Sequence, residues 1–283
     1  MKIKKILVAV DGSAVSMARL ETGLNMAQVM EASLSALYVI PFEVPSITAG
    51  TMHGGWYMGQ EMLAKSHREA IEAAAEVRAA CERLAQSYQT GLDWIQKEGE
   101  IVRIVSSEAR YYDILLLGKP DNVNEPQVRD NDINGILLSS GKACLIIPGA
   151  APLLQQTPGK VLFAWDGSRE ATQALNHSIC FLEQAESVMV VSIYKHKERS
   201  EYVEKDNKRI VDYLLAHEIN ASSHTMEKGH TSTGQLLVNY AEQSEADLIV
   251  MGAYGHSRFR EVVLGGATNH MLHNALIPVL FAH

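Results

Sequence analysis

The sequence predicts an α/β protein built from two doubly wound domains, each a five-stranded parallel sheet flanked by helices. The first observation behind this prediction is a repeat: residues 4–13 (KKILVAVDGS) return as residues 159–168 (GKVLFAWDGS). A second repeat relates residues 112–118 (YDILLLG) to residues 246–252 (ADLIVMG). The third observation is that strand patterns alternate with helix patterns in both copies, which an open parallel sheet requires. We therefore expect domains at residues 1–148 and 159–283, joined by a linker at residues 149–158.

The first copy starts with a continuous apolar run at residues 6–10, which is typical of a strand covered on both faces. Asp11, Gly12 and Ser13 break this strand, and Ser13 stands at the N-cap position of a predicted helix. Further elements follow in alternation. They are predicted as a helix at 14–30, a strand at 32–40, a helix at 60–88, a strand at 92–97, a helix at 100–110 and strands at 112–118 and 143–147.

The second copy repeats this order from an apolar run at residues 161–165, followed by Asp166, Gly167 and Ser168. Ser168 again stands at an N-cap position. The later elements are predicted as a helix at 169–184, a strand at 187–194, a helix at 201–217, a strand at 221–227, a helix at 233–242 and strands at 246–252 and 278–282. The main length difference is an insertion in the first copy at residues 41–60, which reads either as a surface loop or as a lid over an apolar ligand.

Composition excludes several classes of protein. The chain has 283 residues, of which 47% are hydrophobic and 20% charged, as in a globular protein with substantial cores. The net charge is −8, and no run of Lys and Arg exceeds two residues, which argues against a nucleic-acid partner. The first apolar run is too short for a signal peptide and no stretch of about 20 apolar residues occurs, so we expect a cytoplasmic protein without membrane insertion. Cys81, Cys144 and Cys180 read as reduced, partly buried thiols.

Glycines after the fourth strand of the second copy have the spacing of a phosphate loop. Gly252 and Gly255 are followed, after nine residues, by Gly265 and Gly266. Glycines let backbone N–H groups approach an anion, and a helix that begins at the second glycine pair would add its positive dipole end. Other candidate contacts lie close to these glycines in the sequence; they are His256, Ser257, Arg258, Ala267 and Thr268.

With these motifs the chain resembles the universal stress protein family in its tandem, two-domain form, over almost all of both halves. The resemblance implies the Rossmann-like fold of the adenine nucleotide alpha hydrolases, and an ATP site in domains that keep the glycine pattern. Gly252, Gly255 and Gly265 match that pattern. Asp166, Trp165, Gly167, Ile193 and Met251 fall at the strand ends that border the nucleotide, with Ile193 at the position whose backbone meets the adenine.

Two departures from the family pattern bear on the second copy. Gly266 replaces a Ser or Thr and so removes a hydroxyl from a phosphate contact, for which Thr268 is a candidate substitute. Trp165 places a large ring beside Asp166, where it either stacks on a base or fills the pocket. The first copy departs further, because Asp130 and Asn131 stand where the second copy has Gly265 and Gly266. We expect a carboxylate there to repel a triphosphate.

The remaining polar residues leave alternatives open. His270 and His273 have a spacing that can hold a metal, although a helix surface or an interface suits them better without a third ligand. Asp11 and Asp166 read as general bases, Mg²⁺ ligands or turn residues. Ser13 and Ser168 read as helix caps, since the sequence places no partner that would activate a nucleophile.

These observations favour a stress-response protein whose second domain is a regulatory ATP-binding module, with Mg²⁺ as a possible companion and at most slow hydrolysis or self-phosphorylation. The first domain is then a degenerate partner in an intramolecular pseudo-dimer, because the last strands of two such domains commonly pair in the family, and homodimerisation is a further expectation. The alternative is a stress protein that binds no nucleotide and acts as an interaction scaffold or holds a small apolar or lipid-like ligand near residues 41–60.

Overall fold

The fold is known from a computed structural model that describes residues 2–41, 55–119, 130–149, 158–195, 200–255 and 266–283. Its strands are β1 Lys5–Val10, β2 Ser33–Ile40, β3 Leu92–Glu98, β4 Ile114–Gly118, β5 Ala143–Ile147, β6 Lys160–Ala164, β7 Ser187–Tyr194, β8 Ala221–Glu227, β9 Leu248–Gly252 and β10 Val279–Ala282. Its helices are α1 Ala14–Met30, α2 Gly55–Ser87, α3 Ile101–Ala109, α4 Asp130–Ser139, α5 Arg169–Leu182, α6 Ser200–Ala216, α7 Thr233–Gln243 and α8 Gly266–Asn274.

All ten strands form a single sheet in the order β3-β2-β1-β4-β5-β10-β9-β6-β7-β8. Neighbouring strands within each half are parallel, and the two halves meet where β5 and β10 pair antiparallel. Leu280 lies opposite Leu145 in this pairing, and both residues are fully buried. The two predicted five-stranded sheets are therefore present, and they are joined edge to edge as the expected pseudo-dimer.

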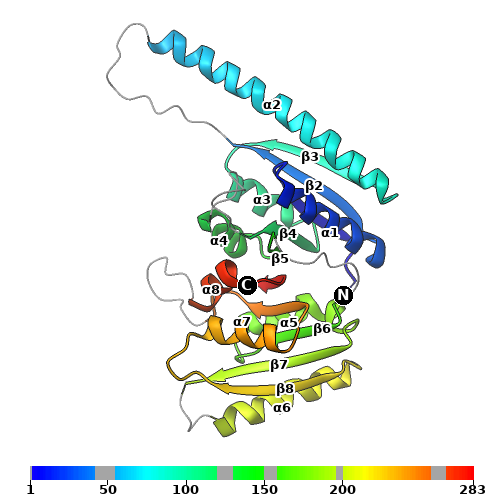
Figure 1. The fold of residues 1–283 in the computed structure, drawn as a ribbon, viewed down its shortest axis with the longest axis vertical. Helices are drawn as coiled ribbons and strands as arrows, with labels where there is room; N and C mark the ends of the chain where they lie inside the picture. The colour runs from blue at the N-terminus through cyan, green and yellow to red at the C-terminus, as the bar shows by residue number, and fades with distance from the viewer. Residues whose placement is uncertain (1, 42–54, 120–129, 150–157, 196–199, 256–265) are drawn as a thin grey trace.

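Helices cover both faces of the sheet, as Figure 1 shows for the two halves. One buried cluster lies between the sheet and α1, α2, α5 and α6, and the other lies between the sheet and α3, α4, α7 and α8. Corresponding helices of the two copies thus lie on the same face. Because all strands within one half are parallel, their carboxyl ends gather at one edge of that half, which is where loops can build a site.

Helix α2 differs from its prediction, because it begins at Gly55 and not at residue 60. The end of the predicted insertion is therefore helical from Gly55 onward. Residues 42–54, the rest of that insertion apart from Pro41, lie outside the described residues, so the lid interpretation stays a prediction. Within the described part of the chain no helix is both long and apolar enough to cross a membrane.

The junction between the halves predicts a large stability effect at its centre. Replacing Leu280 by Ala should lower the free energy of unfolding by about 2–5 kcal/mol, because the substitution leaves a cavity between β5, β10 and the helices. Urea denaturation followed by circular dichroism measures this change. Tyr111→Ala is the control, since Tyr111 is 73% exposed and should change stability by less than about 0.5 kcal/mol. Equal effects of the two substitutions would contradict the prediction.

Candidate functional site

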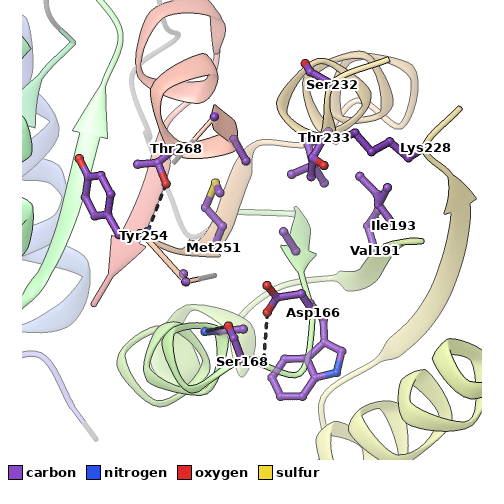
Figure 2. Close-up of a pocket in the computed structure, with 18 of the residues that line it drawn as sticks. Asp166, Ser168, Val191, Ile193, Lys228, Ser232, Thr233, Met251, Tyr254 and Thr268 are labelled. Carbon is purple, nitrogen blue, oxygen red and sulfur yellow. Dashed lines mark hydrogen bonds between the residues drawn. The ribbon is translucent and has the colours of Figure 1, made fainter. Parts of the chain in front are cut away.

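A cavity of about 460 Å³ opens at the carboxyl ends of β6, β7 and β9 in the second half (Figure 2). Volumes of this size are typical of sites for small organic ligands. Its floor is apolar, and its rim is polar. The lining residues are Ala164, Trp165, Asp166, Ser168, Ala171, Val191, Ile193, Lys195, Lys228, Ser232, Thr233, Leu237, Met251, Gly252, Tyr254, Gly255, Gly266, Ala267 and Thr268.

The turn after β6 brings Asp166 to the cavity and caps α5. Gly167 has φ +71°, a left-handed conformation that suits glycine. Asp166 Oδ1 accepts the N–H of Ser168 at 3.0 Å, and Ser168 Oγ accepts the N–H of Ala171 at 3.1 Å. Ser168 is therefore the N-cap of α5, as the sequence predicts, and Ser13 caps α1 through the N–H of Ser16 in the same way.

Trp165 borders the cavity, but its indole ring lies toward the opposite face of the sheet. The indole Nε1 donates a hydrogen bond to Asp206 Oδ2 on α6 at 2.8 Å. The indole ring packs against the ring of Phe163, with the two ring centroids 5.7 Å apart. Phe163 belongs to the buried cluster beneath α5 and α6, and Trp165 packs against the same cluster. Strand alternation explains this position, because residues two apart share a face. The indole therefore leaves the apolar floor of the cavity open.

The glycines of the predicted phosphate loop have different local surroundings. A Cβ added to Gly252 would lie 2.5 Å from the carbonyl carbon of Glu170 and 2.6 Å from the N of Ala171, so the first turn of α5 packs directly on this glycine. The described residues do not crowd Gly255 and Gly266 in this way, since a Cβ on Gly255 would have its nearest described neighbours at 3.6 Å and one on Gly266 would have none within 4 Å. Gly266 begins α8, whose first turn borders the cavity. Residues 256–265, among them His256, Ser257, Arg258 and Gly265, lie outside the described residues.

Tyr254 lies within the glycine motif and has an unusual backbone. Its φ is +61°, a left-handed conformation that costs an aromatic residue on the order of 1 kcal/mol or more. Its N–H donates to Thr268 Oγ1 at 3.3 Å (Figure 2). Thr268 is buried and lines the cavity, but its hydroxyl oxygen already accepts this bond. Burial raises the pKa of the Tyr254 hydroxyl, which therefore stays protonated at neutral pH.

Two carboxylates lie at the Gly255 end of the cavity. Measured from the position that a Cβ would take on Gly255, Glu170 Oε2 lies at 3.6 Å and Asp166 Oδ2 at 3.8 Å. Glu170 is 6% exposed and belongs to the first turn of α5, where the helix dipole stabilises a negative charge. Oxygen ligands of this kind suit Mg²⁺.

Comparisons with known proteins agree with this architecture. The model of the "Universal stress protein family" matches residues 2–121 and 158–283. The chain belongs to the universal stress protein family. Universal stress protein Slr1230 of Synechocystis sp. is 26% identical over 98% of this chain and 99% of its own length. The fold is shared with the crystal structure of a universal stress protein from Archaeoglobus fulgidus DSM 4304, with a TM-score of 0.76, 16% identity, and coverage of 100% of this chain and 99% of that one.

A putative universal stress protein from Pseudomonas aeruginosa UCBPP-PA14 has the same fold, with a TM-score of 0.61, 15% identity, and coverage of 99% of this chain and 93% of that one. Both neighbours cover the two halves, so the tandem two-domain organisation is shared with solved structures of the family. Membership makes this chain one of a family of stress-response proteins.

Among the described residues of the first copy, only a small space remains at the strand ends that correspond to the cavity. The corresponding space measures about 10 Å³ and is bordered by Asp11, Arg19 and Ile101 together with apolar residues of β1, β2 and α3. Arg19 is 2% exposed, and its Nε donates to the carbonyl of Ala9 at 3.0 Å. Counted from the capping serine, Arg19 takes the place that Ala174 has in the second copy. A buried arginine thus helps to close the first site.

The repulsion of a triphosphate by Asp130 and Asn131 stays a prediction, because the structure does not describe the side chains of these residues.

Sequence reasoning also passed over several cavity residues of the second copy. Lys195 follows β7 and Lys228 follows β8, and within the described residues neither forms an ion pair. Ser232 caps α7 and Thr233 begins it. Only Tyr254 carried a signal that could have found it, since it stands between Gly252 and Gly255 in the motif.

The histidines singled out by spacing do not assemble a metal site in the described part of the chain. There, no group of three His, Cys, Asp or Glu residues has metal-binding geometry. His270 packs closely against Gly234 of α7, because a Cβ added to Gly234 would lie only 2.5 Å from the Cβ of His270. His273 Nδ1 lies 2.8 Å from the carbonyl oxygen of Asn269 in the same helix. The interface interpretation therefore holds for His270. Cys81, Cys144 and Cys180 are free and buried, as expected.

The two helix caps predict equal stability effects in the two copies. Ser13→Ala and Ser168→Ala should each lower the free energy of unfolding by about 1 kcal/mol, because an N–H in the first turn loses its acceptor. Ser→Gly at the same positions should cost only a few tenths of a kcal/mol. Urea denaturation of the four variants checks this. Unchanged stability in both alanine variants would refute the capping role.

Proposed function

We propose that the second domain binds an adenine nucleotide, with ATP as the first candidate, and that the chain acts as a nucleotide-dependent regulatory module in the stress response. The observation that carries this proposal is the cavity of about 460 Å³ with an apolar floor, glycines and a helix N-terminus at one end. In this arrangement Val191, Ile193 and Met251 offer an apolar surface to a base. The N–H groups after Gly252 and at the start of α8 lie at the end where phosphates would bind.

The carboxylates favour a nucleotide that carries a cation. Asp166 and Glu170 lie at the phosphate end, where they would repel a bare triphosphate. Mg²⁺ neutralises phosphate charge and takes oxygen ligands, so the carboxylates of Asp166 and Glu170 fit a role of holding the Mg²⁺ complex. The proposal therefore includes ATP with Mg²⁺, and EDTA should weaken the affinity. Nothing in the described residues favours the alternative apolar or lipid-like ligand, whose predicted contact region lies largely outside them.

The proposal predicts a loss of affinity when charge is added at Gly255. Gly255→Asp places a further carboxylate beside Asp166 and Glu170 and should raise the Kd for Mg·ATP at least about tenfold. Gly255→Asn, of similar size but uncharged, separates charge from bulk and should weaken binding less. Isothermal titration calorimetry measures both variants. Gly91→Asp is the matched remote control, because a side chain at Gly91 in the first domain meets no atom within 4 Å.

The same titration tests which copy binds. The described residues of the first copy leave about 10 Å³ at the corresponding strand ends, so the wild type should bind one nucleotide per chain, and Gly255→Asp should weaken this single binding event. A stoichiometry near two, or a wild type that shows neither heat nor thermal stabilisation with Mg·ATP, would overturn the proposal.

A further inference from the structure

In the described part of the glycine loop of the second domain, the side chain of Tyr254 contacts the first domain. Tyr254, which borders the cavity, donates a hydrogen bond from its hydroxyl to Asn134 Oδ1 on α4. Both residues are buried, at 9% and 7% exposure. Figure 2 shows the Tyr254 ring pointing away from the cavity while its backbone stays at the rim. A residue of the first domain therefore contacts a side chain whose own backbone borders the second domain's candidate site.

The backbone at Tyr254 needs several anchors because its conformation is unfavourable. Its φ of +61° belongs to the left-handed region, which a bulky residue adopts only when its surroundings enforce it. The N–H is fixed by Thr268 Oγ1, the preceding carbonyl of Ala253 lies 3.0 Å from His283 Nδ1, and the ring packs edge-on against His283 with centroids 6.1 Å apart. Asn134 holds the far end of the same side chain.

Release of the far end would remove a restraint on the backbone direction at the cavity rim. A left-handed residue that relaxes to negative φ turns the peptide groups on both sides of it. The N–H groups of Tyr254 and Gly255 would then point in new directions relative to the cavity. Anion binding by backbone N–H groups depends on their being oriented before the ligand arrives, so a relaxed loop should bind phosphate more weakly.

The contact runs in one direction only. Counted from the glycine that ends the fourth strand, the first copy has Pro120 where the second has Tyr254. Proline has no hydroxyl and cannot form the reciprocal bond. The first domain thus supports the loop of the second domain through this contact, and the second domain cannot return it in the same way.

We propose that Asn134 is a positioning residue for the ligand site of the second domain, and that the first domain completes this site by holding Tyr254 in its left-handed conformation. The inference rests on the proposed function in so far as the ligand is a nucleotide phosphate. Ligand binding and the contact between the domains are then coupled, and each stabilises the other. The first domain, whose own cavity is closed, acts as a support for its neighbour.

A double-mutant cycle on the full chain tests this proposal. The variants are Tyr254→Phe, which keeps the ring and removes the hydroxyl, Asn134→Leu, which removes the acceptor, and the two combined. Each single variant should raise the Kd for Mg·ATP about five- to tenfold, as expected for one lost hydrogen bond, and the combination should raise it no further. Leu138→Ala is the matched control, since Leu138 lies on the same helix at 48% exposure and should leave the Kd unchanged.

Two calorimetric outcomes would overturn the proposal. If Asn134→Leu lowers the melting temperature but leaves the Kd unchanged, Asn134 has a structural role alone. If the effects of the two single variants add, the residues act by separate routes.

Hydrogen exchange of peptides covering residues 248–255 separates this proposal from the proposed function. Asn134→Leu should speed exchange in this loop relative to Leu138→Ala, whether or not a nucleotide is present. If the wild type binds no ATP, the proposed function fails, and the exchange result alone decides the positioning role. Unchanged exchange in Asn134→Leu would overturn it.

Discussion

Three residue pairs between β5 and β10 hold the two copies in one sheet, and the contacts of Tyr254 with Asn134 and of Lys119 with Ala275 depend on this pairing. Both strands are completely buried along their length. As free edges they would expose apolar surface together with unpaired N–H and C=O groups, which promotes aggregation. Their antiparallel pairing removes both edges at once and brings α4 and α8 close to each other's loops. Lys119, which follows β4, accordingly reaches the carbonyl of Ala275 at 3.4 Å.

The two copies share a backbone plan and differ in what fills the space at their strand ends. In the second copy Ala174 and Thr233 leave room beside Asp166, whereas Arg19 and Ile101 stand at the corresponding places in the first. Burial of an arginine is unfavourable unless its donors are satisfied, and the carbonyl of Ala9 satisfies one of them. Where Arg19 and Ile101 fill the space, no room is left for an anion. A phosphate loop with glycines after Gly118 would therefore have no ligand to bind in the first copy.

Local signals predicted most of the secondary structure. The predicted helix at residues 14–30 and strand at 187–194 agree with the bounds of α1 and β7, because a capping serine and a continuous apolar run are strong markers. The start of α2 was missed, since Gly55 and Gly59 have low helix propensity and read as loop. The repulsion of a triphosphate by Asp130 and Asn131 stays a prediction, whereas the buried Arg19 that narrows the first site was not predicted. No local pattern shows that an arginine on a helix is buried, because its acceptor lies ten residues away on a neighbouring strand.

Glycine spacing alone overstates the ligand signal, because the glycines meet two different physical requirements. Gly252 is required by the close approach of α5, and the first copy keeps Gly118 at the same place although its cavity is closed. A Cβ on Gly255 would have its nearest described atoms at 3.6 Å and one on Gly266 would have none within 4 Å, so packing against the described residues does not require glycine at these two positions. Between Gly252 and Gly255 stands Tyr254, a tyrosine in a conformation that favours glycine, which borders the cavity and contacts the first domain. Its hydrogen bond to Asn134 links the cavity of the second copy to helix α4 of the first.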